Sequence, residues 1–551
     1  MAVPRLPSPI VALLLASLLA APTLAILPAG ARARTDQAQI IEEDPALLAH
    51  PGTTLAQMRA LGASTIRVVL HWDLVAPQDG AKHAPARFDD ADPADYPAAH
   101  WAPYDAVVRD AQADGLTIDL TIAGGAPVWA QGAGIPPQGR ADRSFAWKPN
   151  PRLYGDFVHA VAERYSGRYV PSRGAPPLPR VHWWTLWNEP NFGQDLGPQA
   201  IDGSTVSVAP MMYRGLVDAG WRALHQTGHG GDTIVIGGFA AMGLTGRVDR
   251  AHPLGLPGDY AQTKPRQFVR TLYCLDVNSH PLRAAAAAAV GCPTTAAGTR
   301  AFRTAHPGLF GASGVADHPY SGERSPIDAS DLDGDFALFS QLGGFEHTLD
   351  LAQRVYGSRR RYPIYDDEYG YITRPPHPGP YLSPTTAALY LNWSEYLSWR
   401  SARVASYAQY LLTDPPPGRH VGFASGLETL QGRPKATLYA YRLPLFLPQT
   451  TVAAGRSAEV WGNARPAPFM ARDADGPQRV RIGFQAGGRG PFRTLQTVTV
   501  GARDGYFDLR LRFPASGNVR LTYQYPRRDP FLATSLEGET IHSRVVKLTV
   551  L

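Results

Sequence analysis

Apolar segments alternate with helix-like segments along most of this 551-residue chain. The segment 65–70 is rich in β-branched residues and follows Gly62, which is typical of a strand, whereas 101–113 places Tyr104 and Val107 on one apolar helix face. By the same reasoning, strands are expected at 40–41, 64–72, 116–123, 181–189, 233–239, 314–320, 362–371 and 402–412. Such an alternation indicates a parallel sheet, and eight strands close naturally into a (β/α)8 barrel.

An open, doubly wound sheet is the competing fold for this alternation. That fold needs a glycine-rich phosphate-binding turn after its first strand, and no G-x-G-x-x-G is present there. We therefore expect the barrel.

The pattern changes after Leu447-Pro448. Short strands with alternating apolar residues are expected at 480–482, 495–500, 506–513, 519–525 and 545–550, with turn residues between them. Such a run predicts a small antiparallel β-sandwich. The expected organisation is thus a barrel domain over 34–448 and a β-sandwich domain over 449–551.

Residues 1–33 resemble an export signal. Arg5 precedes an apolar run from Val11 to Ala21, and the segments 29–31 and 31–33 both fit the small-x-small cleavage pattern. Cleavage would leave a secreted or cell-envelope protein without stable membrane insertion. An uncleaved anchor is the alternative.

Charge and cysteine content exclude several classes of function. The 53 Lys and Arg exceed the 47 Asp and Glu, but the basic residues form no run of five, so nucleic-acid binding is not expected. Cys274 and Cys292 are candidates for a disulfide in an exported protein, with two free thiols as the alternative. No other cysteine and no histidine cluster with ligand spacing is present, so neither a metal nor a cofactor is expected.

Polar residues stand at the carboxyl ends of the expected strands, where barrel proteins place their sites. Pro190 ends the fourth strand just after Glu189, and Glu368 lies on the seventh. The other candidates are Arg67, His71, Trp129, Asn188, His318, Tyr320, Gln409 and Tyr410. Two glutamates that face one barrel mouth suit hydrolysis of a glycosidic bond. One would protonate the departing oxygen, and the other would attack the sugar or activate a water.

The neighbouring residues suit these two roles. The acid needs a raised pKa, and Trp184 and Trp187 could desolvate Glu189. The ionised partner needs a cation and hydrogen-bond donors, and the strands that carry Arg67 and Tyr320 could supply them to Glu368. Asn188 could form a hydrogen bond with a sugar hydroxyl, and Trp129 could provide an apolar platform for a sugar ring.

Each candidate has a structural alternative. The Asn188-Glu189-Pro190 tripeptide could cap a helix. Glu368, beside two aspartates, could belong to a solvated acidic loop. His318 could be a core histidine whose hydrogen bonds are satisfied, Arg67 could form a structural ion pair, and Trp129 could pack in the core.

The chain resembles the clan A glycoside hydrolases over residues 40 to about 447. The segment 184–191, Trp-Thr-Leu-Trp-Asn-Glu-Pro-Asn, resembles their fourth-strand signature, and 365–370, Tyr-Asp-Asp-Glu-Tyr-Gly, resembles their seventh-strand motif. The segments 66–68, 125–129 and 317–320 match in order and place. The chain is most similar to exported actinobacterial proteins of the family 5 cellulase type, with family 39 as a close relative.

The resemblance implies that Glu189 is the acid/base, that Glu368 is the nucleophile, and that the reaction proceeds with retention through a covalent glycosyl-enzyme, without a metal. It also implies that Asn188 contacts the sugar 2-hydroxyl, that Arg67 and Tyr320 hold Glu368, and that His318 lies at the edge of the subsite.

The chain departs from this family in two places. The eighth strand lacks the usual tryptophan platform and offers Tyr407, Gln409 and Tyr410 instead. Residues 241–312 form a long insertion after the fifth strand and carry both cysteines. Both changes touch the substrate cleft, so the family's substrates do not transfer to this chain.

The sequence therefore predicts an exported, monomeric, retaining β-glycosidase that acts on a polysaccharide or oligosaccharide. One alternative is a catalytically silent carbohydrate- or cell-wall-binding protein on the same barrel. Another makes the C-terminal sandwich a glycan-binding part. We expect a packing role for the sandwich, because Trp461 is the only tryptophan in its strands.

Overall fold

The computed structural model describes residues 36–135, 146–200, 206–244, 261–416, 423–465, 478–501, 504–527 and 536–551. The expected export signal at 1–33 lies outside these residues. None of the helices in the described ranges combines the length and the apolar composition that a bilayer span requires.

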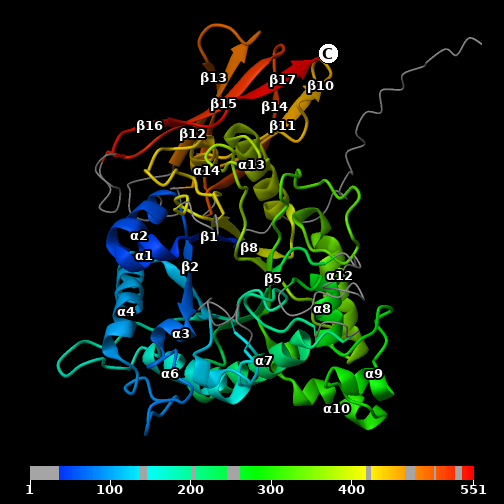
Figure 1. The fold of residues 1–551 in the computed structure, drawn as a ribbon. Helices are drawn as coiled ribbons and strands as arrows, with labels where there is room; N and C mark the ends of the chain where they lie inside the picture. The colour runs from blue at the N-terminus through cyan, green and yellow to red at the C-terminus, as the bar shows by residue number, and fades with distance from the viewer. Residues whose placement is uncertain are drawn as a thin grey trace, which may run out of the picture.

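Eight strands form a closed barrel in sequence order, with β1 paired to both β2 and β8 (Figure 1). Adjacent strands are parallel all the way around, which confirms the predicted barrel. The strands are β1 (Ala38–Glu42), β2 (Thr65–His71), β3 (Thr117–Ala123), β4 (Trp183–Leu186), β5 (Thr233–Ala240), β6 (Gly314–His318), β7 (Ile364–Asp366) and β8 (Val404–Tyr410).

Helices connect the strands on the outside of the barrel (Figure 1). Their boundaries follow local signals, as at Asn150, whose side-chain oxygen accepts hydrogen bonds from the first backbone amides of α6. The barrel helices are α1 (Asp44–Ala49), α2 (Pro51–Ala60), α3 (Trp72–Val75), α4 (Ala98–Ala113), α6 (Pro151–Arg164), α7 (Ala209–Gln226), α8 (Pro265–Leu272), α9 (Ala284–Ala289), α10 (Ala296–Ala305), α11 (Gly308–Gly311), α12 (Leu342–Val355), α13 (Pro384–Arg400) and α14 (Ala436–Arg442). Two short 3-10 helices are η1 (Val128–Ala130) and η2 (Phe339–Gln341).

The seventh strand is shorter than the sequence predicts. We expected a strand over 362–371, but β7 covers only three residues, and its register with β8 shifts between Ile364 and Tyr365. Because the chain leaves the sheet early, the segment after β7 is free to carry Asp367 and Glu368 towards the barrel mouth.

Buried side chains pack against one another in the barrel interior. Trp183 points inward, where its ring lies 5.0 Å from that of Tyr365. Successive side chains of a strand point to opposite faces, so Trp184 points outward and donates a hydrogen bond to Asp232 (3.2 Å). Trp187 packs edge-on against Tyr154. The expectation that Trp184 desolvates Glu189 is therefore wrong.

The C-terminal part forms two further sheets. A six-stranded sheet has the order β10-β17-β15-β12-β13, with β16 paired to β15, and a three-stranded sheet has the order β14-β11-β9. Both sheets contribute side chains to one buried apolar cluster. The pairing is antiparallel as predicted except between β10 and β17, which are parallel, while the sandwich arrangement stays a prediction. The strands are β9 (Leu445–Phe446), β10 (Thr451–Val452), β11 (Ser457–Asn463), β12 (Gln478–Ala486), β13 (Arg493–Val500), β14 (Tyr506–Arg512), β15 (Gly517–Gln524), β16 (Thr540–His542) and β17 (Val546–Val550).

A buried polar network joins these sheets to the barrel. The Arg465 guanidinium lies 2.7 Å from a carboxylate oxygen of Glu395 on α13 and also donates to the side chain of Gln39 on β1. The Tyr506 hydroxyl donates to the other oxygen of Glu395 (2.9 Å). Trp461 is fully buried and stacks on Tyr506, so it cannot serve as an exposed sugar platform.

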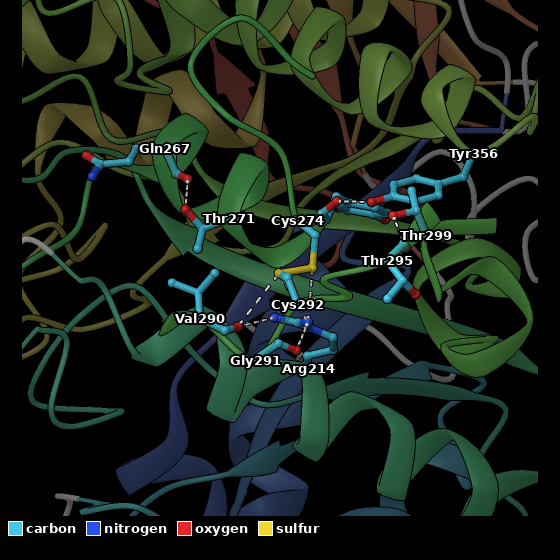
Figure 2. Close-up of a disulfide and its surroundings, with 11 residues drawn as sticks. Arg214, Gln267, Thr271, Cys274, Val290, Gly291, Cys292, Thr295, Thr299 and Tyr356 are labelled. Atoms are coloured by element: carbon cyan, nitrogen blue, oxygen red, sulfur yellow. Dashed lines mark hydrogen bonds between the residues drawn. A yellow bond between two sulfur atoms is a disulfide. The ribbon is translucent and has the colours of Figure 1, made fainter. Parts of the chain in front are cut away.

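The insertion after β5 contains α8 to α11 and is held to α7 (Figure 2). Cys274 and Cys292 form a disulfide, and the guanidinium of Arg214 lies 3.2 Å from the Cys274 sulfur. Arg214 also donates to the carbonyls of Val290 and Gly291. These contacts attach the insertion to the helix that follows the Glu189 strand.

Candidate functional site

A cavity of about 210 Å³ opens at the carboxyl ends of the barrel strands. Its walls include five of the residues predicted from sequence, namely Arg67, His71, Asn188, Glu368 and Tyr410. They also include Glu42, Asp44, Pro45, Val69, Gly124, Asp195 and Leu411. Ionisable side chains therefore dominate the lining.

Glu189 is held just beyond β4 in an unusual backbone conformation. Its φ of 37° lies in the left-handed region, which is costly for a residue with a side chain, and such strain is concentrated at functional sites. The Glu189 amide donates to the carbonyl of Gly238 on β5 (2.9 Å). The next described helix, α7, begins only at Ala209, so the tripeptide 188–190 does not cap a helix.

A bulge in β5 makes room for this arrangement. The register between β5 and β6 shifts between Gly237 and Phe239, and Gly238 has a φ of 67°. A Cβ atom on Gly238 would lie 3.3 Å from Nε2 of His318 and 3.8 Å from the amide nitrogen of Glu189. Glycine therefore allows the close approach of three strands at this point.

His318 bridges the two glutamates. Its Nδ1 lies 3.0 Å from Oε1 of Glu189 and 2.9 Å from Oε2 of Glu368, and its side chain is fully buried. Burial alone would lower the pKa of His318, but the charge of Glu368 and hydrogen bonds to both glutamates raise it well above its ordinary value. The contacts of Nδ1 with both carboxyl groups favour the protonated imidazole, which goes beyond the role of a satisfied core histidine.

Glu368 is kept ionised by its neighbours. Burial would raise its pKa, but the charge and hydrogen bond of His318, the charge of Arg67 and the hydroxyl of Tyr320 lower it to about 2. Tyr320 donates to Oε1 (3.1 Å), and a guanidinium nitrogen of Arg67 lies 3.5 Å from Oε2. Only 12% of the side chain is exposed, which excludes a solvated acidic loop.

Glu189 shows the opposite tendency. Burial raises its pKa, the hydrogen bond and charge of His318 act against this rise, and the charge of Glu368 adds to it. The net effect is a pKa above the ordinary value. Two neighbouring carboxyl groups whose pKa values are pushed apart mark an acid and a base.

Arg67 links the site to the barrel wall. It donates to Asn188 Oδ1 (2.6 Å), forms a short ion pair with Glu42 and lies 3.6 Å from Asp367. The side chain is 1% exposed. Arg67 is therefore a structural ion-pair partner and a neighbour of Glu368 at the same time.

The remaining predicted residues differ in position. His71 lines the cavity, and burial, with a smaller effect from the Arg67 charge, lowers its pKa to about 4, so it is a neutral donor or acceptor. Trp129 does not line the cavity. Its ring packs edge-on against Trp72 and Phe88, and its indole nitrogen donates to Pro77 (3.2 Å), so core packing describes it better than a sugar platform.

Four residues near the cavity were not predicted. Glu42 ends β1, which was expected to be a weak strand of two residues, Asp44 begins α1, and Asp195 lies in the loop after β4. For Glu42 and Asp44, the position at a strand end was the available signal. Phe423 is 41% exposed, and its ring lies 5.0 Å from that of Tyr320 and 5.8 Å from that of Tyr410. No signal in the sequence marks this aromatic residue.

Three side chains of the site, Glu189, His318 and Glu368, have the spacing of metal ligands. One atom each of Glu189, His318 and Glu368 lies within 4.8 Å of the other two. A histidine ligates a metal only when it is neutral. The raised pKa of His318 favours its protonated form, which disfavours a metal at this place.

No protein-family model and no curated protein matches the chain. A similar solved structure is a family 39 glycoside hydrolase from the gut symbiont Bacteroides cellulosilyticus WH2, at 14% identity and a TM-score of 0.44 over 87% of this chain and 79% of that one. A family 1 β-glucosidase from Thermotoga maritima is 11% identical, with a TM-score of 0.43 over 75% and 98% of the two chains. A β-glucosidase from Trichoderma harzianum is 14% identical, with a TM-score of 0.43 over 75% and 97%. At these TM-scores the neighbours provide no support for the fold. The strand order by itself establishes the barrel.

Proposed function

We propose that this protein is a retaining glycoside hydrolase that cleaves β-linked glycans by double displacement. One observation carries the proposal. Carboxylate oxygens of Glu189 and Glu368 lie within 4.8 Å of each other, and their pKa values are shifted in opposite directions. Retaining glycosidases place their two carboxyl groups about 5–5.5 Å apart, whereas inverting ones need about 6.5–9.5 Å to admit a water.

In the first step, the protonated Glu189 gives its proton to the glycosidic oxygen while a Glu368 oxygen bonds to the anomeric carbon. The bond between that carbon and the leaving oxygen breaks, and a glycosyl ester on Glu368 results. In the second step, Glu189 takes a proton from a water that attacks the same carbon and releases Glu368.

The other residues position the reacting groups. Tyr320 and Arg67 hold the Glu368 carboxylate, and Nδ1 of His318 contacts both glutamates. Asn188 accepts from Arg67 through its oxygen, so its amide nitrogen, 3.3 Å from Asp195, is directed towards the cavity wall where a sugar hydroxyl would bind.

The finer assignments belong to this proposal. They are membership of clan A close to families 5 and 39, an export signal at 1–33, a barrel domain over 34–448, a β-sandwich over 449–551, and action outside the cytoplasm on a polysaccharide or oligosaccharide. The signal-like composition of the N-terminal residues supports export, and the close approach of Glu189 and Glu368 supports membership of the clan.

A panel of 2,4-dinitrophenyl and 4-nitrophenyl β-glycosides provides the test. Wild type should release the phenol, and NMR of the sugar product should show that the anomeric configuration is retained. Glu189→Gln should keep activity on the dinitrophenyl glycosides, whose leaving group needs no proton, and azide should accelerate it and give a β-glycosyl azide. Glu368→Gln should lose activity by a factor of about 10⁴ or more.

Glu323→Gln provides the matched control, because Glu323 is an exposed glutamate outside the cavity. If wild type and Glu189→Gln were equally inactive across the panel yet still bound oligosaccharides, the protein would be a silent carbohydrate-binding barrel. Inversion of the anomeric configuration would exclude the double displacement.

A further inference from the structure

The outer face of the six-stranded sheet carries a set of cations. On β12, Val480 and Ile482 point into the apolar cluster and are fully buried, whereas Arg479 and Arg481 are exposed on the opposite face. This division follows from the two-residue period of a strand. Figure 1 shows this sheet at the far end of the molecule from α9 and α10.

Strand pairing brings distant cations onto the same face. Directly opposed residues of antiparallel strands point to the same side of a sheet. In the pair formed by β12 and β15, Arg481 is opposite Thr522. Two residues further along, Gly483 is opposite Arg520, so Arg481 and Arg520 lie on the same face. Asn518 on β15 is opposite Lys547 on β17. We call the surface formed by Arg479, Arg481, Arg520 and Lys547 the basic face.

The strands that carry the basic face supply no compensating acid. The strands β12, β13, β15, β16 and β17 contain no aspartate and no glutamate. Among the described residues, no ion pair involves any of the four cations. Burial, together with the charges of Arg520 and Arg481, lowers the pKa of the neighbouring His542. The electrostatic fields of Arg481 and Arg520 therefore overlap at His542.

Hydroxyl groups accompany the cations. Thr497 and Thr499 on β13 are exposed and lie opposite Arg481 and Arg479. The nearby ring of Phe492 lies 4.2 Å below the Arg520 guanidinium, so this cation covers it. A surface for nucleobases needs free aromatic faces for stacking, whereas rows of guanidinium and hydroxyl groups suit carboxylates and sugar hydroxyls.

We propose that the basic face binds an anionic polysaccharide, with the arginines pairing with its carboxylates and the threonines hydrogen-bonding to its hydroxyls. The inner face of the same sheet packs in the apolar cluster, so the two faces have separate roles. The sequence favoured a packing role over glycan binding, because Trp461 is the only tryptophan in these strands, and the spread of the cations over 479–547 gave no basic run to suggest otherwise. Charge complementarity is the basis of the proposal, and it does not depend on turnover in the barrel.

The test measures binding of the full chain to de-esterified polygalacturonate by affinity electrophoresis at low and moderate salt. The triple variant Arg479→Gln/Arg481→Gln/Lys547→Gln should bind about tenfold more weakly or worse, and wild-type affinity should fall as salt rises. The control Arg173→Gln/Arg456→Gln/Arg512→Gln removes three exposed arginines outside the basic face and should bind within about twofold of wild type. Melting curves should show that both variants remain folded.

Three outcomes would overturn the proposal. The first is equal weakening in the two triple variants, which would indicate a response to net charge. The second is no binding of wild type to polygalacturonate at low salt. The third is tighter binding to a 20-base-pair DNA or to phosphatidylglycerol vesicles, with the loss confined to the basic-face variant, which would assign the face to that partner.

Discussion

Nδ1 of His318 lies 2.9 Å from Oε2 of Glu368, inside a pocket that leaves no surface of the histidine exposed. The charge and hydrogen bond of this cation are the largest effects that lower the Glu368 pKa to about 2. In the proposed reaction Glu368 attacks in its ionised form, so activity should be present above this pKa and should be lost as pH falls through it.

The variant His318→Gln should raise the pKa of Glu368, because the glutamine donates a hydrogen bond without a charge. We expect the acidic limb of the kcat/KM profile to move upward by roughly 1–3 pH units. The alkaline limb reports the proton on Glu189, whose pKa is raised by burial in the wild type. An unchanged acidic limb would show that His318 does not set the charge state of Glu368.

The variant Gly238→Ala should reduce activity through backbone strain. A residue with a side chain at φ 67° costs about 1–2 kcal/mol, and the new methyl group would press on His318. A lower melting temperature and a lower kcat are expected together. In the control Gly231→Ala, no atom lies within 4 Å of the added Cβ, and neither quantity should change. An unchanged kcat in Gly238→Ala would show that the β5 bulge is not needed to position His318 and Glu189.

Arg465→Met should destabilise the whole protein, because it leaves the buried Glu395 without its cation. Removal of one partner from a buried ion pair costs about 3–5 kcal/mol. Chemical denaturation should show this loss, with a single transition for barrel and C-terminal sheets. Arg152→Met breaks an exposed ion pair with Asp156 and should cost at most about 0.5 kcal/mol. Equal costs for the two variants would mean that the network contributes little.

Metal removal should leave the reaction unaffected. Glu189, His318 and Glu368 have metal-binding spacing, but the raised pKa of His318 favours its protonated form, which does not ligate a metal. Dialysis against EDTA followed by assay in metal-free buffer should retain full activity. A loss of activity that one divalent ion restores would instead establish a metal centre.

Much of the barrel could be predicted from sequence because its strands are locally marked. β-branched runs such as 65–70 and polar residues at strand ends such as Asn188 and Glu189 are features of adjacent residues. The two glutamates were paired by their strand numbers alone, and the structure places them within 4.8 Å.

Other features depend on contacts between distant segments, which local patterns do not report. The shortness of β7 follows from its register with β8, and the outward direction of Trp184 follows from the strand period once Trp183 is inside. Phe423 reaches Tyr320 and Tyr410 through a loop. The basic face needs the pairing of β12, β15 and β17, which no single stretch of sequence contains.

The side chains that fill the barrel interior also bear on the order of events in the proposed reaction. Trp183, Ile40, Val235, Ala316 and Ala408 close the barrel beneath the glutamates. A water that attacks the glycosyl ester then has to come from the cavity side, through the space that the leaving group has just vacated. An alcohol or a second sugar held in that space would compete with water for the same carbon. In the proposed reaction, the packed interior would therefore leave water and any acceptor a single shared route to the glycosyl ester.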